Sequence, residues 1–421
     1  MVRINQRTTK PFSLLIKPTS ADCNLNCDYC FYLEKHRIYP ATKRPRMNDE
    51  VLEQIISSYM NTPQPVYYFG WQGGEPTLMG LDFFAKIVEF QKKYGRQGAV
   101  VSNGLQTNAT LISDSLAALL SKYKFLVGVS IDGPQEIHNQ YRTHVKGHGS
   151  HADVLRGIDT LKKHGVEFNA LVLVNSSNVE HPREVYRYMT DLQIYHHQYI
   201  PCVEFDNEGQ PRSFAISGKH WGTFLCGLFD EWIRNDTRKV SIRLFDSILG
   251  HLMDWQSRMC IQGGRCDRYF LVEHNGDIYP CDFFVESKKK LGNIMTNAWE
   301  ELGGSAKYRS FGSLKADWNK RCKGCDFLRF CGGDCLKHRF YKDKNPGSLS
   351  WLCAGWKKFY HHSLPTFEKI ALSLLNERQA AFPHHRRTHF NKLPPLNIGK
   401  KDSCFCGSGK KFESCHGDRR K

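Results

Sequence analysis

The first half of the chain alternates short apolar runs with segments of helical periodicity. We predict buried parallel strands at FSLLIK, VYYFGWQ, FLVGVSID, FNALVLV and HQYIP, all between residues 12 and 201. The segments between these runs predict helices over residues 49–60, 81–94, 114–123 and 151–164. Repeated strand–helix units indicate an α/β fold with a parallel sheet, open or closed into a barrel. In such folds ligands bind beyond the carboxyl ends of the strands.

The helix predicted over residues 49–60 has a clear apolar face. That face is made of Val51, Leu52, Ile55, Ile56 and Tyr59. Asn48 precedes the helix and is its expected N-cap, because a short polar side chain there accepts a hydrogen bond from the first turn.

The strand–helix alternation stops near residue 240, and cysteines dominate the chain from there to about residue 375. A chain of 421 residues exceeds the size at which one core stops growing, so several domains are expected. We predict a first domain over 10–235, a metal-stapled second domain over 236–376, a polar linker over 377–403 and a terminal module over 404–417.

Composition and charge narrow the class of protein. Apolar residues at 40% and aromatic residues at 12% supply a buried core, and no apolar run approaches the roughly 18 residues of a membrane span. The N-terminus has no apolar signal-peptide region, which indicates a cytoplasmic protein. The formal charge of +17 raises the possibility of a nucleic acid or acidic partner, but no RNA-recognition signature accompanies it. A generally basic surface is the favoured interpretation.

The 16 cysteines occur in tight spacings that favour metal binding over disulfides in a long chain without a secretion signal. Only Cys202 and Cys226 stand alone, and we expect both to be small core residues. Cys23, Cys27 and Cys30 form a C-x3-C-x2-C triad with no fourth ligand at a zinc-finger spacing. Three thiolates on a [4Fe–4S] cube leave one iron open for a small molecule, which explains the missing ligand.

This triad, with an aromatic Tyr29 before its last cysteine, resembles the radical S-adenosylmethionine (SAM) superfamily, as does the GGEP sequence at 73–76. The resemblance implies that the open iron binds SAM and that a 5′-deoxyadenosyl radical is produced. Glycines after a strand would let backbone carbonyls approach the ammonium group of SAM. The resemblance also implies cofactor contacts for Tyr29, Gly73, Gly74, Glu75, Gln106, Thr107, Asn108, Ser130 and Arg142. Asp132 is expected to orient its loop.

Eight further cysteines lie between residues 260 and 353, enough for two four-cysteine sites. Two structural zinc sites are one interpretation. The arrangement also resembles the SPASM extension of peptide-modifying radical SAM enzymes, which carries two auxiliary [4Fe–4S] clusters. That resemblance implies a first ligand set of Cys260, Cys266, Cys281 and Cys335. It implies a second set of Cys322, Cys325, Cys331 and Cys353.

Within the superfamily, residues from about 10 to 375 resemble the anaerobic sulfatase-maturating enzymes, through QYIPCVE and VEHNGDIYPCDFFV in addition to the motifs above. This implies a partial (β/α)6 barrel followed by a SPASM domain. It also implies oxidation of a Cys or Ser to formylglycine in an unfolded sulfatase segment of the type C/S-x-P-x-R, with an electron donor such as flavodoxin or ferredoxin. Asp282 is the implied base, and Tyr32 and Gln72 are implied pocket residues.

The C-terminal segment CFCGSGKKFESCHG contains four nitrogen or sulfur ligands, namely Cys404, Cys406, Cys415 and His416. A segment this short has no core, so a closed structural zinc would supply its folding free energy. It resembles the SEC-C motif, which suggests docking to a translocase, a ribosome or a nascent chain. A passive basic tail is the competing interpretation.

Two other functions remain open from the sequence. One is a SPASM enzyme that installs a different peptide modification, such as a thioether or an epimer. The other is a non-catalytic protein that binds several zinc ions and acts as an adaptor for RNA or nascent chains.

Overall fold

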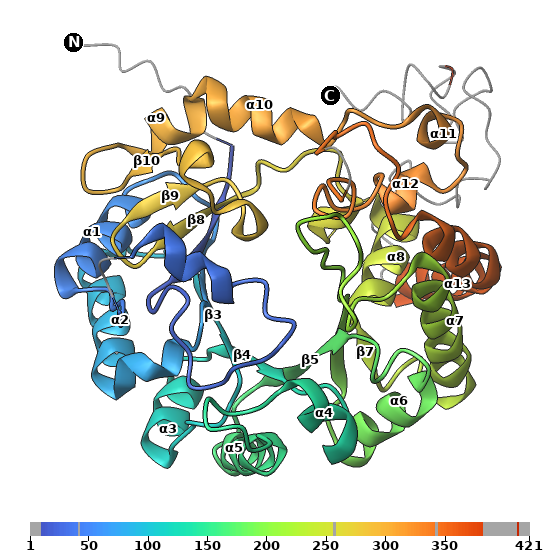
Figure 1. Ribbon diagram of the computed structural model, residues 1–421, viewed down its shortest axis with the longest axis horizontal. Helices are drawn as coiled ribbons and strands as arrows, with labels where there is room; N and C mark the ends of the chain where they lie inside the picture. Colours follow the sequence, from blue (N-terminus) through green and yellow to red (C-terminus); the bar gives the residue numbers. More distant parts are fainter. Residues whose placement is uncertain (1–9, 41–42, 256–257, 342–343, 382–410, 412–421) are drawn as a thin grey trace.

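The computed structural model describes residues 10–40, 43–255, 258–341, 344–381 and 411. One curved sheet organises this part of the chain, and most helices lie on its outer side (Figure 1). Its ten strands follow the order β10-β9-β8-β1-β2-β3-β4-β5-β6-β7. The two edge strands do not pair with each other, so the fold is a partial barrel.

The strands from β1 to β7 are parallel to their neighbours. Their bounds are β1 Ser13–Lys17, β2 Tyr67–Trp71, β3 Val101–Thr107, β4 Leu126–Ser130, β5 Phe168–Val174, β6 His196–Pro201 and β7 Ser241–Ile242. All five apolar runs that predicted strands are confirmed. The α/β class with a parallel sheet is confirmed as well.

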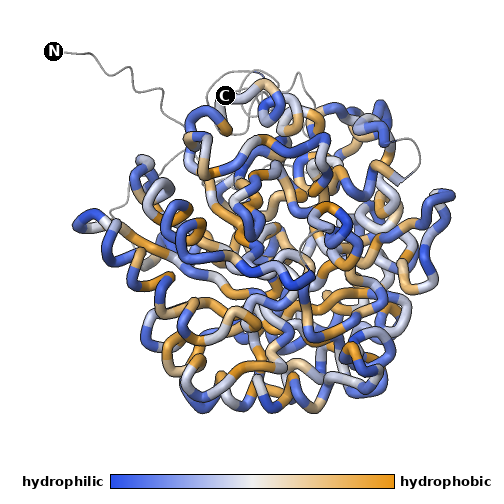
Figure 2. The backbone as a smooth tube through the Cα atoms, turned by 60° about the vertical axis from the view of Figure 1, so that its left-hand side comes forward, coloured by the Kyte–Doolittle hydropathy of each residue, from blue (hydrophilic) through white to orange (hydrophobic). Residues whose placement is uncertain are grey.

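The α-helices that follow or cover these strands are α1 Asp49–Met60, α2 Gly80–Tyr94, α3 Asp114–Lys122, α4 Gln135–Tyr141, α5 His151–Lys163, α6 Pro182–Asp191, α7 Gly218–Asn235 and α8 Arg243–Asp254. The four predicted helices appear with ends within one residue of the prediction. Asn48 caps α1, since its side chain accepts a 2.9 Å hydrogen bond from the Val51 amide. The predicted apolar face of α1 is buried. Apolar segments run through the interior of the molecule (Figure 2).

The cysteine-rich half contributes strands to the same sheet. It contains β8 Tyr269–Glu273, β9 Asp277–Tyr279, β10 Gly292–Asn293, α9 Trp299–Gly304, α10 Ala306–Leu314, α11 Lys320–Lys323, α12 Leu328–Cys331 and α13 Cys353–Ala381. Strand β8 pairs in parallel with β1, with Lys17 opposite Glu273. We expected the strand–helix alternation to end near residue 240, so β8 was not among the predicted strands. The sheet therefore crosses the boundary proposed at residues 235 and 236.

Helix α13 packs against α7 and α8. Gly355 makes the approach to α7 possible, because a Cβ there would lie 2.2 Å from the Gly218 carbonyl oxygen. The helix continues to Ala381, so the predicted linker over 377–403 begins with helical residues. None of the helices in the described ranges is long and apolar enough to span a membrane.

Candidate functional site

The cysteine triad follows β1 and packs against the loop after β2. The Gly74 amide donates a 2.7 Å hydrogen bond to the Ser20 carbonyl, and the Glu75 amide donates one of 2.9 Å to the Asp22 carbonyl. A Cβ on Gly74 would lie 1.9 Å from the Asp22 carbonyl oxygen. We expected this glycine to admit a ligand. Its demonstrable role is to let the backbone before Cys23 approach the β2 loop.

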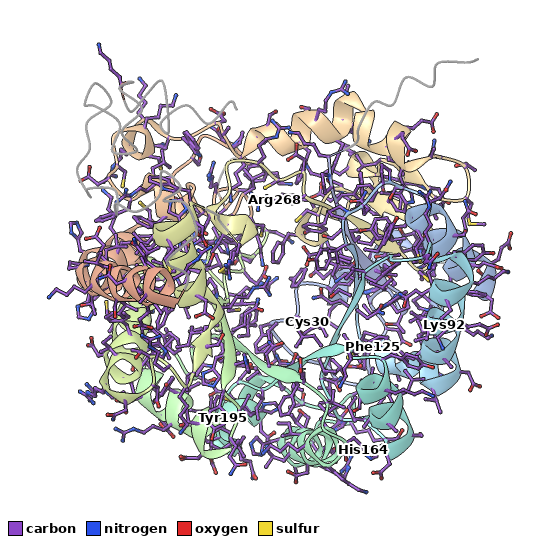
Figure 3. The ribbon with its side chains drawn as sticks, turned by 180° about the vertical axis from the view of Figure 1, so that it is seen from behind. Cys30, Lys92, Phe125, His164, Tyr195 and Arg268 are labelled. Atoms are coloured by element: carbon purple, nitrogen blue, oxygen red, sulfur yellow. The ribbon has the colours of Figure 1, made fainter. Side chains whose placement is uncertain are left out.

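The three thiols of the triad lie in one neighbourhood on the inner side of the curved sheet, where Cys30 is labelled in Figure 3. They pack with Leu25, Tyr29 and the isolated Cys202. Burial raises the pKa of the Cys27 thiol to about 11, so metal binding must displace its proton. Both isolated cysteines are buried, as predicted: Cys202 is 3% exposed and Cys226 is 9% exposed.

Glu75 of the GGEP sequence is fully buried and braces the carboxyl end of β3. One oxygen, Oε1, accepts hydrogen bonds from the Thr77 amide at 3.0 Å and the Thr107 hydroxyl at 2.8 Å. The other, Oε2, accepts from the Asn108 amide at 2.7 Å. The carboxylate therefore holds the loops after β2 and β3 together, and its expected contact with SAM stays a prediction.

Asp132 joins Tyr29 and Arg142, two of the predicted SAM contacts. Its Oδ2 atom accepts hydrogen bonds from the Tyr29 hydroxyl and, at 3.0 Å, from Arg142 Nε. Its Oδ1 atom accepts from the Leu173 amide at 3.0 Å. The Arg142 side chain also lies over the Tyr29 ring, 5.4 Å from its centroid. Asp132 thus orients its surroundings, as predicted.

The remaining predicted cofactor contacts lie at the same edge of the sheet. Gln106 Nε2 donates a 3.1 Å hydrogen bond to the Ser130 hydroxyl across β3 and β4. Asn108 Nδ2 lies 3.7 Å from Cys23 Sγ and donates to the Asn24 side chain at 2.9 Å. The structure therefore brings the triad and the ends of β2, β3 and β4 together, as expected for parallel strands.

The eight auxiliary cysteines fall into two groups in space. Burial, together with the nearby thiols of Cys260 and Cys266, raises the pKa of Cys335 to about 12. Burial also raises the pKa of Cys281, next to Asp282 and Cys335.

The second group of auxiliary thiols lies around Cys331. Burial raises the pKa of the Cys331 thiol, and the thiols of Cys353 and Cys322 raise it further. Burial raises the pKa of Cys353, which Cys322 and Cys325 also raise. Within each expected ligand set, thiols therefore influence one another, and the assignment of the two sets stays a prediction.

Asp282 lies beside Cys281 in a short helical turn, Asp282–Phe284, that follows β9. Tyr269 at the start of β8 donates a 2.9 Å hydrogen bond to Asp282 Oδ1, and its hydroxyl lies 3.1 Å from Cys281 Sγ. Asp282 Oδ2 forms no hydrogen bond with the residues that the structure describes. The Asp282 side chain is half-buried. Tyr269 therefore holds one carboxylate oxygen, and the other is not engaged by the described residues.

Lys17 is a charged residue that our sequence reasoning missed. It ends β1 and is 1% exposed, with its Nζ 4.2 Å from the centroid of the Tyr32 ring. Burial lowers its pKa, and the opposing charges of Asp282, Glu273, Cys30 and Cys281 counteract this. One buried cation therefore interacts with a triad cysteine and with the predicted base. The signal was the single lysine at the end of the apolar run FSLLIK.

The two predicted pocket residues differ in their surroundings. Tyr32 is 2% exposed, and its hydroxyl donates a hydrogen bond to Glu273. Gln72 follows β2, where its amide donates a 2.8 Å hydrogen bond to the Ile16 carbonyl. Both residues lie next to β1, and the Tyr32 ring contacts the Lys17 ammonium group.

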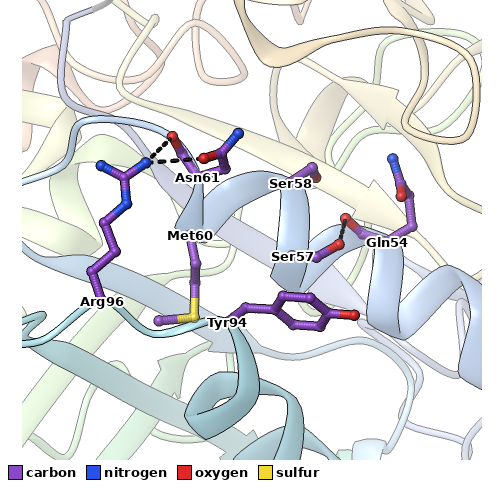
Figure 4. Close-up of a pocket in the computed structure, with 7 residues that line it drawn as sticks. All are labelled: Gln54, Ser57, Ser58, Met60, Asn61, Tyr94 and Arg96. Atoms are coloured by element: carbon purple, nitrogen blue, oxygen red, sulfur yellow. Dashed lines mark hydrogen bonds between the residues drawn. The ribbon is translucent and has the colours of Figure 1, made fainter.

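Two cavities accompany these elements. One of about 200 Å³ lies along the triad loop and is lined by Cys23, Leu25, Asn26 and Val145, among others. A second of about 370 Å³ lies between α1 and the end of α2, where Arg96 donates hydrogen bonds to Asn61 (Figure 4). No predicted site residue lines this second cavity. The predicted zinc ligands Cys404, Cys406, Cys415 and His416 lie outside the described residues.

Comparison with known proteins agrees with this geometry. Residues 18–189 match the radical SAM superfamily, residues 260–326 match the SPASM iron–sulfur cluster-binding domain, and residues 401–418 match the SEC-C motif. A serine-type anaerobic sulfatase-maturating enzyme of Bacteroides thetaiotaomicron is 39% identical over 391 residues, which cover 88% of this chain and 94% of that enzyme. The chain belongs to the anaerobic sulfatase-maturating enzymes.

Other anaerobic sulfatase-maturating enzymes are similar to this chain in sequence and in structure. A cysteine-type anaerobic sulfatase-maturating enzyme of Clostridium perfringens is 38% identical and covers 86% of this chain and 98% of that enzyme. The solved structure of native anSMEcpe with bound AdoMet and Cp18Cys peptide superposes with a TM-score of 0.81 at 37% identity. It covers 87% of this chain and all of that one. As a radical SAM enzyme with a SPASM domain, the protein uses SAM and iron–sulfur clusters.

Proposed function

We propose that this protein oxidises a Cys or Ser side chain in a sulfatase-type peptide to formylglycine under anaerobic conditions. The observation that carries the proposal is the position of Asp282. Its carboxylate adjoins the predicted cluster ligand Cys281, its charge acts on the buried Lys17, and one of its oxygens is bonded to Tyr269. The similarity to serine-type and cysteine-type sulfatase-maturating enzymes supports the same chemistry.

Three [4Fe–4S] clusters and one zinc ion complete the proposed cofactors. Cys23, Cys27 and Cys30 would hold the cluster that binds SAM. The first four-cysteine set around Cys281 and the second set around Cys331 would hold auxiliary clusters with full cysteine ligation. The terminal Cys404, Cys406, Cys415 and His416 would bind the zinc.

The reaction requires removal of one hydrogen atom, one proton and one further electron from the substrate side chain. When bound, SAM and its cluster supply a 5′-deoxyadenosyl radical that takes the hydrogen atom. Asp282 accepts the proton at its unbonded Oδ2, since a thiol or hydroxyl is a weak acid near neutral pH. Tyr269 holds Oδ1 and so fixes the direction of the carboxylate. The position of Cys281 next to Asp282 allows the proton and the electron to leave on the same side.

The proposed macromolecular substrate is an unfolded sulfatase segment of the type C/S-x-P-x-R. The solved relative anSMEcpe with bound AdoMet and Cp18Cys peptide supports a peptide substrate. A small redox protein such as flavodoxin or ferredoxin would supply electrons. The SEC-C motif would dock the enzyme to a translocase, a ribosome or a nascent chain, and cytoplasmic localisation fits that role.

Anaerobic reconstitution followed by a peptide assay tests the proposal. We expect roughly twelve irons per chain, at four per cluster, and an aldehyde in a C/S-x-P-x-R peptide after incubation with SAM and reductant. Replacing Cys23, Cys27 and Cys30 by Ala should remove about four of those irons and all SAM cleavage. SAM cleavage by the triple variant would refute the radical SAM site. A thioether or an epimer in place of the aldehyde would refute the formylglycine assignment.

A further inference from the structure

Two buried cations bind backbone carbonyls in the segments that carry the predicted auxiliary ligands. Lys315 directly follows α10 and is 1% exposed. Its Nζ donates hydrogen bonds of 2.8 Å to the carbonyl oxygens of Cys260 and Ile261. The ammonium group is therefore held against the backbone of a predicted ligand of the first cluster.

Arg339 is the second cation and is 2% exposed. Its Nε donates a 2.7 Å hydrogen bond to the Gly333 carbonyl, and its Nη1 donates one of 3.0 Å to the Lys315 carbonyl. Further bonds run to the carbonyls of Pro346 and Gly332, at 3.1 and 3.2 Å. The guanidinium group is thus held by backbone carbonyls, and it links the segment after Cys331 to the end of α10.

Neither side chain has a carboxylate partner in the described part of the chain. Burying a charge is costly unless an opposite charge compensates it. Carbonyl oxygens supply partial compensation but no net charge. The nearest candidates for a full negative charge are the two cysteine sets, because thiolate-ligated clusters are anionic.

The backbone contacts of the two cations together reach both ligand sets. Lys315 Nζ binds the carbonyl of Cys260, a predicted ligand of the first set. Arg339 Nη2 donates hydrogen bonds to the carbonyls of Gly332, next to Cys331, and of Asp334, next to Cys335, at 3.2 and 3.4 Å. Lys315 therefore lies at the first set, whereas Arg339 lies at segments that carry ligands of both.

We infer that Lys315 and Arg339 are positioning residues that raise the reduction potentials of the two auxiliary clusters. The inference rests on the proposed function, because it takes the cysteine sets as cluster ligands. A cluster becomes more negative when it gains an electron, and a fixed cation in a low-dielectric interior stabilises that reduced form. Lys315 acts on the first cluster, and Arg339, which stays protonated in proteins, acts on both.

For the reaction, higher cluster potentials would favour transfer of the electron from the substrate to the protein. After hydrogen-atom abstraction, the substrate carbon loses one electron and one proton as the aldehyde precursor forms. Asp282 would accept the proton, and the cluster that the Cys281 set would hold would supply the electron acceptor. A one-electron carrier of the flavodoxin or ferredoxin class then takes the electron. A higher potential at this cluster makes the first electron transfer more favourable.

The test is an anaerobic redox titration of the reconstituted full-length enzyme, followed by electron paramagnetic resonance with and without SAM. Only the cluster with an open iron should respond to SAM, so the auxiliary signals are identified separately. In Lys315→Met we expect the reduction equilibrium of one auxiliary cluster to shift at least tenfold, about 59 mV more negative for one electron. In Arg339→Met both auxiliary clusters should shift. Lys315→Arg should restore the wild-type potential.

Lys323→Met is the matched control. Lys323 lies between the predicted ligands Cys322 and Cys325 but is exposed, so water screens its charge and the potentials should not change. Wild-type potentials in Lys315→Met and Arg339→Met with full iron content would overturn the inference. Loss of iron from both Met variants, with retention in Lys315→Arg, would assign the cations a purely structural role and would also overturn it. Absence of reducible auxiliary clusters in the wild type would instead refute the proposed function.

Discussion

The Tyr269 hydroxyl donates a 2.9 Å hydrogen bond to Oδ1 of Asp282. The same hydroxyl lies 3.1 Å from Cys281 Sγ, so one group contacts both the proposed base and a proposed cluster ligand. Tyr269 is the first residue of β8, the strand that joins the barrel sheet beside β1. The base is therefore anchored to the barrel through the sheet as well as through its own loop.

Asp282→Asn should retain all three clusters and continue to cleave SAM. A positioned carboxylate contributes about 10²- to 10⁴-fold to proton transfer, so the formylglycine yield should fall at least roughly 100-fold. The decisive measurement is the ratio of 5′-deoxyadenosine to modified peptide. A ratio equal to that of the wild type would show that Asp282 is only a structural neighbour of the cluster.

Tyr269→Phe should keep its iron, because the tyrosine is not a ligand, but should lose the orientation of Asp282. A hydrogen bond to a charged group contributes about 1.5–3 kcal/mol, so we expect formylglycine per 5′-deoxyadenosine to fall by at least roughly tenfold. Tyr308→Phe is the control, since its hydroxyl donates to the Tyr269 carbonyl at 2.8 Å and leaves Asp282 untouched. Equal ratios in the two variants would argue against orientation by Tyr269.

Gly74→Ala should disturb the triad loop selectively. Its Cβ would lie 1.9 Å from the Asp22 carbonyl oxygen, so the backbone before Cys23 must move. Overpacking of this kind costs about 1–3 kcal/mol. We expect a lower melting temperature, loss of iron from the SAM-binding cluster and intact auxiliary clusters.

The matched control for that variant is Gly304→Ala, because nothing lies within 4 Å of a Cβ at Gly304. It should retain the wild-type iron content and SAM cleavage. Full SAM cleavage by Gly74→Ala would mean that the loop adjusts without moving Cys23.

Deletion of residues 400–421 should release about one zinc ion, the content of a four-ligand structural site. Turnover of a short peptide should persist, because the SEC-C match covers residues 401–418, beyond the SPASM match and at the end of the predicted linker. Metal analysis and a peptide assay with short and full-length substrates measure both effects. Loss of short-peptide turnover would place the tail within the catalytic body.

Periodicity and motif spacing predicted much of the fold and of the candidate site. The apolar face of α1, the strands β1, β2, β4, β5 and β6, and the triad after β1 all depend on residues close together in the chain. Such local patterns are set by the period of helices and strands, so a single sequence reveals them. The tight cysteine spacings likewise predicted metal binding, because they too are local in the chain.

Tertiary structure alone decided how distant segments meet. The pairing of β8 with β1 joins residues far apart in the chain, and no local pattern encodes such a register. The same holds for Lys17. In the sequence it is a single lysine at a strand end, and only folding buries it where the charges of Asp282 and Cys281 act on it. The sequence determined which ligands exist, and long-range packing determined which charges surround them, because electrostatic interactions depend on distance and burial.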